Sequence, residues 1–132
     1  MDLNAILRQG FKLLNKGEYE RCAQLCKTVP ARHQKNGGFL FLRARLLERQ
    51  QQLGDARALY ERLVSLAPDN PQFHFGLGRV LKAEGNQNAA EMQVRRALAL
   101  EPFLPEAEYL LAMILLSSGR YDAAASGAQK LV

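Results

Sequence analysis

The fold is decided by residues 73–102, which read FHFGLGRVLKAEGNQNAAEMQVRRALALEP. Apolar residues recur every three or four positions on both sides of Gly85, a spacing that predicts two amphipathic helices joined by a short turn. A small residue stands in each predicted helix, at Gly78 and at Ala90. Because two antiparallel helices approach closely only where side chains are small, we expect these two residues to mark the crossing. Pro102 is expected to end the second helix.

The same pattern recurs outward from this stretch at a period of 34 residues, which is the spacing of a repeat protein. A small residue followed three positions later by leucine occurs at Gly10 and Leu13, Ala44 and Leu47, Gly78 and Leu81, and Ala112 and Leu115. A second column of small residues reads Cys22, Ala56, Ala90 and Ala124. The turn between the helices holds Gly17, Gln51, Gly85 and Gly119, so glycine is missing only in the second copy. No hairpin can bury its apolar stripe alone, and we therefore expect four stacked hairpins.

This arrangement resembles the tetratricopeptide repeat family over nearly the whole chain, as repeats 3–36, 37–70, 71–104 and 105–132. The third repeat matches the family pattern best, at Leu77, Gly78, Leu81, Gly85, Ala90, Ala97 and Pro102. The resemblance implies an all-α fold, a right-handed superhelical solenoid of antiparallel helix pairs, in a single domain spanning residues 1–132. The first helix of each repeat would line the concave face.

The first repeat departs from this pattern. Pro30 is expected to end its second helix early, and the polar stretch from Ala31 to Gly38 then forms a longer connection. The fourth repeat stops at Val132 without a polar capping helix. Solenoid ends need such a cap, so we expect either further chain or a homo-oligomer formed through this C-terminal repeat. No following helix would cover all of its apolar residues, which are Leu110, Leu111, Ile114, Leu115, Ala124 and Leu131.

Composition sets further limits. The chain is 48% hydrophobic and 23% charged, as is ordinary for a globular protein. Its longest apolar run, from Tyr109 to Leu116, is far shorter than the roughly 20 residues that cross a bilayer, so no membrane span is predicted. Residues 1–14 lack the features of a secretory signal, and the expected location is the cytoplasm. Cys22 and Cys26 are expected to pack as small apolar residues rather than to form a disulfide.

The net charge of +5 is unevenly distributed. Residues 1–66 hold 12 Lys and Arg against 6 Asp and Glu, whereas residues 67–132 hold 6 against 7. Electrostatic steering of a partner should therefore favour the first of these halves. The basic residues are dispersed and form no recognised nucleic-acid motif, so nucleic acid is not an expected partner.

The sequence offers little for catalysis. His33 and His74 are its only histidines, and neither has a nearby nucleophile or base in the sequence. His33 is expected to be solvated. The resemblance implies a core-facing aromatic at the place of His74, so His74 is expected to be a packed core side chain, with a ligand role as the alternative. Cys22 and Cys26 lack the second pair of ligands that a zinc site requires. We therefore predict a protein that is not an enzyme and has no cofactor and no metal.

The 34-residue register also predicts a binding groove. One column of the first helices reads Leu7, Phe41, Phe75 and Tyr109, and the column one turn later reads Phe11, Arg45, Arg79 and Met113. Arg49 and Lys82 follow one further turn along. Aromatic residues and arginine are enriched in binding hot spots, so we expect these ten side chains to line the concave groove. In the alternative, the aromatics pack against neighbouring helices and the arginines are solvated.

The leading hypothesis is a protein-protein interaction scaffold that binds a peptide or partner protein with acidic and hydrophobic side chains. Family members that clamp a carboxylate use lysine, arginine and asparagine at places that here hold Leu7, Phe11, Leu42, Gln72 and Gly76. The asparagine ladder of other members would fall at Arg8, Leu42, Gly76 and Leu110. Both devices are therefore missing. The alternative function is an N-terminal accessory region of a larger, transferase-like enzyme whose catalytic domain lies beyond residue 132.

Overall fold

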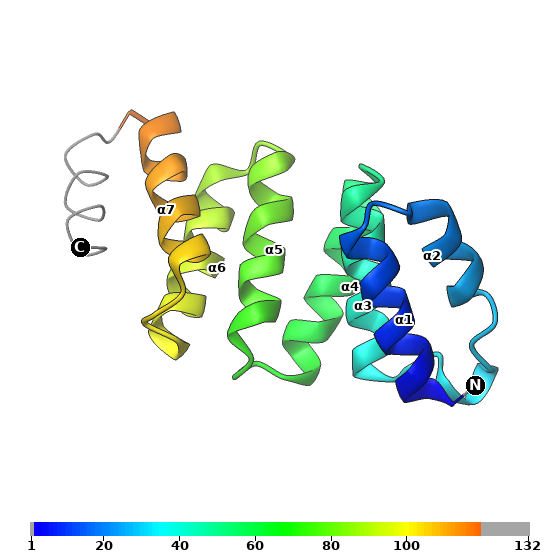
Figure 1. Ribbon diagram of the computed structural model, residues 1–132. Coiled ribbons are helices and arrows are strands. Elements are labelled where there is room, and N and C mark those ends of the chain that lie inside the picture. Colours follow the sequence, from blue (N-terminus) through cyan, green and yellow to red (C-terminus); the bar gives the residue numbers. More distant parts are fainter. Residues whose placement is uncertain (1, 120–132) are drawn as a thin grey trace. The chain divides into compact units, whose positions relative to one another are not determined.

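The computed structural model describes residues 2–119, and these residues form seven α-helices and one 3₁₀ turn, with no strand among them (Figure 1). The predicted all-α class is confirmed. The elements are α1 (Leu3–Asn15), α2 (Tyr19–Cys26), η1 (Ala31–His33), α3 (Gly37–Arg49), α4 (Leu53–Leu66), α5 (Pro71–Ala83), α6 (Gln87–Leu100) and α7 (Pro105–Ser117).

The helices keep the period that the sequence predicts. The four first helices, α1, α3, α5 and α7, are each 13 residues long. They begin at Leu3, Gly37, Pro71 and Pro105, which are the predicted repeat boundaries. The second helices α2, α4 and α6 begin at Tyr19, Leu53 and Gln87, again 34 residues apart.

Each first helix ends on a residue with left-handed backbone conformation. The φ angles are 79° at Gly17, 63° at Gln51, 88° at Gly85 and 78° at Gly119. In the first three repeats the next backbone N–H donates back to the leucine of the first column over 2.9 Å: Glu18 to Leu13, Gln52 to Leu47 and Asn86 to Leu81. This is the Schellman type of helix end, in which the left-handed residue is usually glycine. The recurring glycines therefore have a conformational cause.

The helices group into two compact units, which we call the N-terminal half (residues 1–66) and the C-terminal half (residues 67–132). In the N-terminal half, α1 packs on both α2 and α3. A Cβ atom at Gly10 would lie 2.5 Å from Leu42 Cδ2 of α3, so the Leu42 side chain would have to shift to admit a larger residue. Cys22 Sγ of α2 donates to the Gly10 carbonyl oxygen over 3.4 Å. The first pair of small residues thus marks a helix crossing, as predicted.

The two cysteines pack as the sequence predicts, without a disulfide. Cys22 is fully buried, and Cys26 is half-buried one turn later on α2. The hydrogen bond with Cys22 and burial both raise the pKa of the Cys26 thiol above its ordinary value. Since the thiolate is the reactive form, Cys26 has the character of a packed side chain rather than of a nucleophile.

The first connection differs from the prediction at both ends. The helix α2 ends at Cys26, four residues before Pro30, so proline is not what stops it. Thr28 Oγ1 instead donates to the Leu25 carbonyl over 2.6 Å and satisfies an acceptor of the last turn. At the other end, Asn36 Oδ1 accepts from the Phe39 N–H over 3.1 Å, so α3 begins at Gly37.

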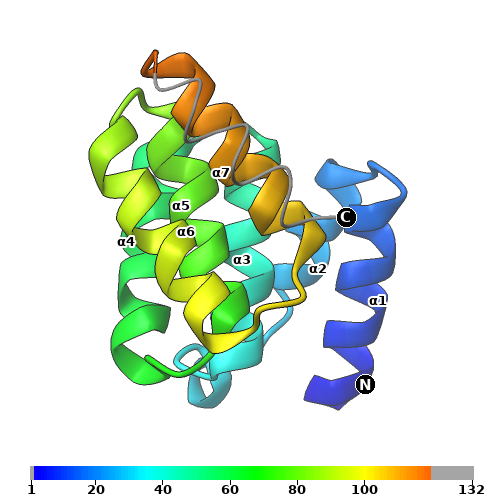
Figure 2. The same cartoon turned by 90° about the vertical axis from the view of Figure 1, so that its left-hand side faces the viewer.

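In the C-terminal half, α5, α6 and α7 pack against one another (Figure 2). A Cβ atom at Gly78 would lie 2.6 Å from Val94 Cγ2 and 3.4 Å from the Ala90 carbonyl oxygen. The predicted crossing of Gly78 with Ala90 is therefore confirmed. Val94 is fully buried, whereas Leu100 is 43% exposed at the end of α6.

His74 is a packed core side chain, as predicted, and both of its ring nitrogens have partners. Nδ1 lies 2.8 Å from Gln93 Oε1 of α6, and Nε2 lies 2.7 Å from the Pro68 carbonyl oxygen. A carbonyl only accepts, so Nε2 carries a hydrogen that it donates to Pro68. The histidine therefore links the segment before α5 to α6.

Candidate protein-binding site

The N-terminal half holds a row of three aromatic rings that begins at α1. The rings of Phe11 and Phe41 lie 5.8 Å apart between centroids, and those of Phe41 and Tyr60 lie 6.5 Å apart in an edge-on arrangement. Tyr60 is fully buried, and its hydroxyl donates to Glu48 Oε1 over 2.9 Å. Phe11 and Phe41 are half-buried. The structure thus brings together two predicted site residues, Phe11 and Phe41, next to a tyrosine that is fixed in the core.

Arg45 lies next to this row of rings. Its guanidinium carbon is 5.8 Å from the centroid of the Phe41 ring, a cation–π arrangement, and the side chain is half-buried. The alternative of a solvated arginine is therefore wrong for this residue. Arg49, one turn further along α3, is exposed, and Leu7 on α1 is half-buried.

The C-terminal half repeats the arginine and phenylalanine pair. Arg79 lies over the ring of Phe75 at 4.6 Å, closer than its counterpart in the preceding repeat. Phe75 itself is only 7% exposed, so its covering arginine presents more surface than the ring. On α7, Tyr109 is 65% exposed, and both Met113 and Lys82 of α5 are half-buried. Tyr109 is the predicted aromatic with the most accessible ring.

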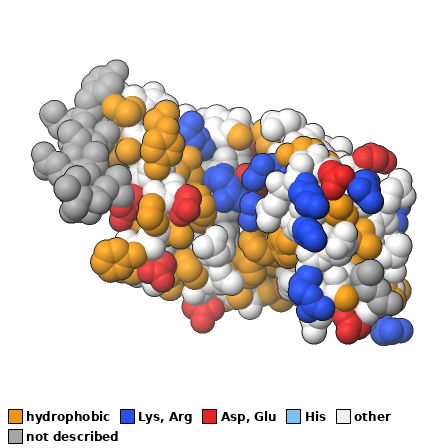
Figure 3. Space-filling model, viewed as in Figure 1, with side chains coloured by type: hydrophobic (Ala, Val, Ile, Leu, Met, Phe, Trp, Pro, Cys, Tyr) orange, Lys and Arg blue, Asp and Glu red, His pale blue; other side chains and the backbone are white. Residues whose placement is uncertain are grey.

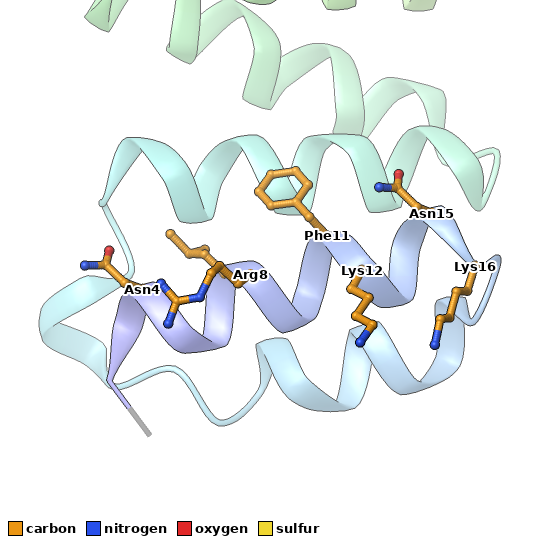
Figure 4. Close-up of a pocket in the computed structure, with 7 residues that line it drawn as sticks. Asn4, Arg8, Phe11, Lys12, Asn15 and Lys16 are labelled. Atoms are coloured by element: carbon orange, nitrogen blue, oxygen red, sulfur yellow. The ribbon is translucent and has the colours of Figure 1, made fainter.

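A hollow of about 710 Å³ follows one side of α1 (Figure 4). Two of its lining residues, Leu7 and Phe11, are predicted site residues, and Figure 4 shows Phe11 on the side of α1 that faces α3. The others are polar or basic and are absent from the prediction: Asn4, Arg8, Lys12, Asn15 and Lys16.

The sequence does contain a signal for this basic side. Arg8, Lys12 and Lys16 are spaced four residues apart, which places them on one face of a helix. The prediction follows columns that recur in every repeat, and this row does not recur. One repeat later, the place of Arg8 is taken by Leu42. A search within single helices finds the row.

Two kinds of feature are absent from the part of the chain that the structure describes. No group of three or more His, Cys, Asp or Glu side chains within residues 2–119 is arranged to hold a metal ion. None of the helices α1 to α7 is both long and apolar enough to cross a membrane.

Two family models, both described as tetratricopeptide repeat, match the sequence at residues 38–80 and 75–132. The chain belongs to the tetratricopeptide repeat family. Solved structures of MamA resemble the whole fold of this tetratricopeptide repeat protein. MamA 41-end from Desulfovibrio magneticus RS-1 is 18% identical, with a TM-score of 0.87 over 98% of this chain and 73% of that one.

Two further structures give the same result. One crystal structure of MamA is 23% identical, with a TM-score of 0.81 over 99% of this chain and 73% of that one. The MamA MSR-1 structure is 21% identical, with a TM-score of 0.80 over 99% and 75%. At these identities the likeness establishes the fold. No curated protein sequence matches the chain.

The family and the fold together give the coarse function. The chain is an all-α helical-repeat protein of the solenoid type, and tetratricopeptide repeats form protein-interaction scaffolds. A protein-interaction role is therefore supported. The right-handed superhelix, the single-domain organisation and the cytoplasmic location stay predictions.

Proposed function

We propose that the chain binds a segment of a partner protein on one face of each first helix, and we call these the first-helix faces. They consist of the predicted site residues Leu7, Phe11, Phe41, Arg45 and Arg49 in the N-terminal half, and Phe75, Arg79, Lys82, Tyr109 and Met113 in the C-terminal half. The observation that carries the proposal is the recurring pair in which an arginine lies over a phenylalanine ring.

These pairs favour a partner with carboxylate groups. A guanidinium group has five N–H donors, so it can bind a carboxylate while it keeps its contacts within the protein. A guanidinium held on an aromatic ring is also restricted before the partner arrives, which reduces the entropy that binding costs. Exposed or half-buried apolar side chains at Phe11, Tyr109 and Met113 add contacts for hydrophobic residues. The partner is therefore acidic and hydrophobic.

The homo-oligomer predicted through the fourth repeat stays a prediction. Residues 120–132, which include Ala124 and Leu131, lie outside the described residues. Ile114 and Leu115 are 0% and 2% exposed, so these two side chains do not contribute to an uncovered surface.

Site-specific photo-crosslinking tests the proposal. A photoreactive phenylalanine analogue is placed at Arg49 or Tyr109 on the first-helix faces, and at Arg62 or Met92 as controls on the second helices. All four side chains are exposed, so the substitutions should leave the fold intact. We expect one partner to be captured from lysate at Arg49 and Tyr109 but not at the controls. Capture of that partner mainly from Arg62 or Met92 would contradict the proposal.

A further inference from the structure

Three cations follow one another along α1 at every fourth residue: Arg8, Lys12 and Lys16, which we call the basic row. An α-helix rises about 1.5 Å per residue, so neighbouring members lie about 6 Å apart along the axis. All three side chains are exposed, and all three line the hollow described above. Lys and Arg side chains gather over α1 in Figure 3, and Figure 4 shows the members of the row projecting from this one helix.

The basic row is not neutralised by its own half. Within residues 2–119, none of its three side chains forms an ion pair or a hydrogen bond. Most acidic side chains of the N-terminal half contact other groups. Asp2 accepts from the Ala5 N–H, Glu18 pairs with Arg21, Glu20 accepts from Gln24, Glu48 accepts from Tyr60, and Glu61 pairs with Arg57.

Helix chemistry explains only part of the row. Lys12 lies in the last turn of α1 and Lys16 is its C-cap, where cations are favoured by the partial negative charge of a helix end. Arg8 lies in the middle of the helix, where this effect has faded. The helix end therefore does not account for the charge of Arg8, which continues the row of the two lysines beside the hollow.

The side of the row next to α3 is apolar. Leu7 and Phe11 line the same hollow, and Phe11 is held against Phe41 at 5.8 Å. A ligand that fits must therefore present negative charges at regular intervals on one side and apolar groups on another. An extended polypeptide does so, because alternate side chains project to opposite sides and those on one side repeat about every 6.6 to 6.8 Å. This spacing is close to that of the basic row.

We propose that the hollow beside α1 binds an extended, acidic segment of the partner protein, in which alternate residues are Asp or Glu. The carboxylates contact Arg8, Lys12 and Lys16, and an apolar side chain between them packs on Leu7 and Phe11. This inference rests on the proposed function and names the chemistry of its partner at the N-terminal end of the first-helix faces. The positions differ from those of the family's carboxylate clamp, which here hold apolar residues such as Leu7 and Phe11.

The test uses the full chain and three synthetic probes. The first is a nine-residue peptide with glutamate at every second position and leucine and serine between. The second has the same composition with its glutamates in one block, and the third is an oligothymidylate. A triple variant, Arg8→Gln, Lys12→Gln and Lys16→Gln, removes the basic row with little change in helix propensity. The control, Lys27→Gln, Lys35→Gln and Arg62→Gln, removes the same charge from exposed side chains elsewhere in the N-terminal half.

Calorimetry should show that the alternating peptide binds more tightly than the block peptide. The dissociation constant of the alternating peptide should rise about tenfold or more in the row variant, because several surface ion pairs are lost together. It should change less than about twofold in the control variant. Binding should weaken as NaCl is raised, since exposed charges are screened.

Four results would overturn the inference: no binding of the alternating peptide, equal binding of the block peptide, an equal loss in the control variant, or tighter binding of the oligothymidylate. The crosslinking experiment keeps this failure separate from failure of the proposed function. A partner captured at Arg49 and Tyr109 whose binding ignores the basic row removes only the present inference. Capture from the second helices alone removes the proposed function itself.

Discussion

Gln51 occupies the turn position that the other three repeats give to glycine. Its φ of 63° is the only left-handed value at a residue other than glycine within residues 2–119. For a residue with a Cβ atom this conformation is unfavourable by about 1 kcal/mol or more. At Gly85, the equivalent position of the next repeat, an added Cβ atom would meet nothing within 4 Å. The cost of a residue other than glycine at this turn position therefore comes from its backbone conformation and not from steric contact with neighbouring atoms.

We expect Gln51→Gly to raise the free energy of unfolding by about 0.5 to 1 kcal/mol, because relief of the left-handed strain exceeds the added flexibility of the unfolded chain. The reverse change, Gly85→Gln, should lower it by about 1 kcal/mol. Urea titrations followed by circular dichroism measure both. Gln52→Gly is the control, since Gln52 is also exposed but lacks a positive φ. A gain of the same size at Gln52 would show that left-handed strain is not the cause.

At this scale the sequence predicts whatever recurs. The glycine column locates the turns because a left-handed residue is needed once per repeat, and the column also marks Gln51 as its exception. The basic row is missed for the opposite reason: Arg8 has no counterpart, and its place in the next repeat is the buried Leu42. Comparison between repeats reveals the residues that every hairpin needs in order to fold. It does not reveal residues that bind a ligand, because a ligand contacts only some of the hairpins.

The hairpin of α5 and α6 is fixed by contacts between its two helices. Leucine at Gly78 would place several methylenes where Val94 Cγ2 already lies, only 2.6 Å from an added Cβ atom. We expect Gly78→Leu to lower the free energy of unfolding by about 1 to 3 kcal/mol through overpacking. The control is Gly54→Leu near the start of α4, where an added Cβ atom meets nothing within 4 Å. It should be neutral or slightly stabilising, since glycine is a poor helix former.

Thermal melts of Gly78→Leu and Gly54→Leu test this prediction. Equal midpoints would mean that Gly78 is not at a tight crossing. Gln93 on α6 would not serve as a control, because it is half-buried and its side chain lies 2.8 Å from His74 Nδ1. The family resemblance predicts that His74 is buried. It cannot predict this partner, which lies 19 residues away and is brought close only when α5 packs on α6.

Some helix boundaries can be predicted from the repeat in the sequence, and others cannot. The starts of α3, α5 and α7 coincide with the predicted repeats because each repeat has the same length. The end of α2 does not follow Pro30, since the local bond from Thr28 to Leu25 closes the helix earlier. Such a bond depends on one side chain and leaves no periodic trace in the sequence.

For the molecule as a whole, the repeat register places Arg45 and Arg79 at equivalent points of successive first helices, one in each half. The register determines the face of each helix on which these residues lie. It does not determine the angle between repeats, so the continuous groove predicted from the sequence stays a prediction. Binding affinities can test for such a groove, because a segment that contacts both halves must bind less tightly when a contact in either half is removed.

We expect Arg45→Glu and Arg79→Glu each to weaken binding of the crosslinked partner about tenfold or more, because each replaces an attraction with a repulsion. The double variant should show roughly the product of the two losses, since the sites are on separate helices. Loss of each stacked pair should also cost about 0.5 to 1 kcal/mol of stability, so melts must first show folded variants. The control is Arg57→Glu with Arg95→Glu, which reverses the same charge in surface ion pairs of the second helices. If calorimetry finds that only one of the two reversals weakens binding, the partner occupies one half alone, and a single groove across both is excluded.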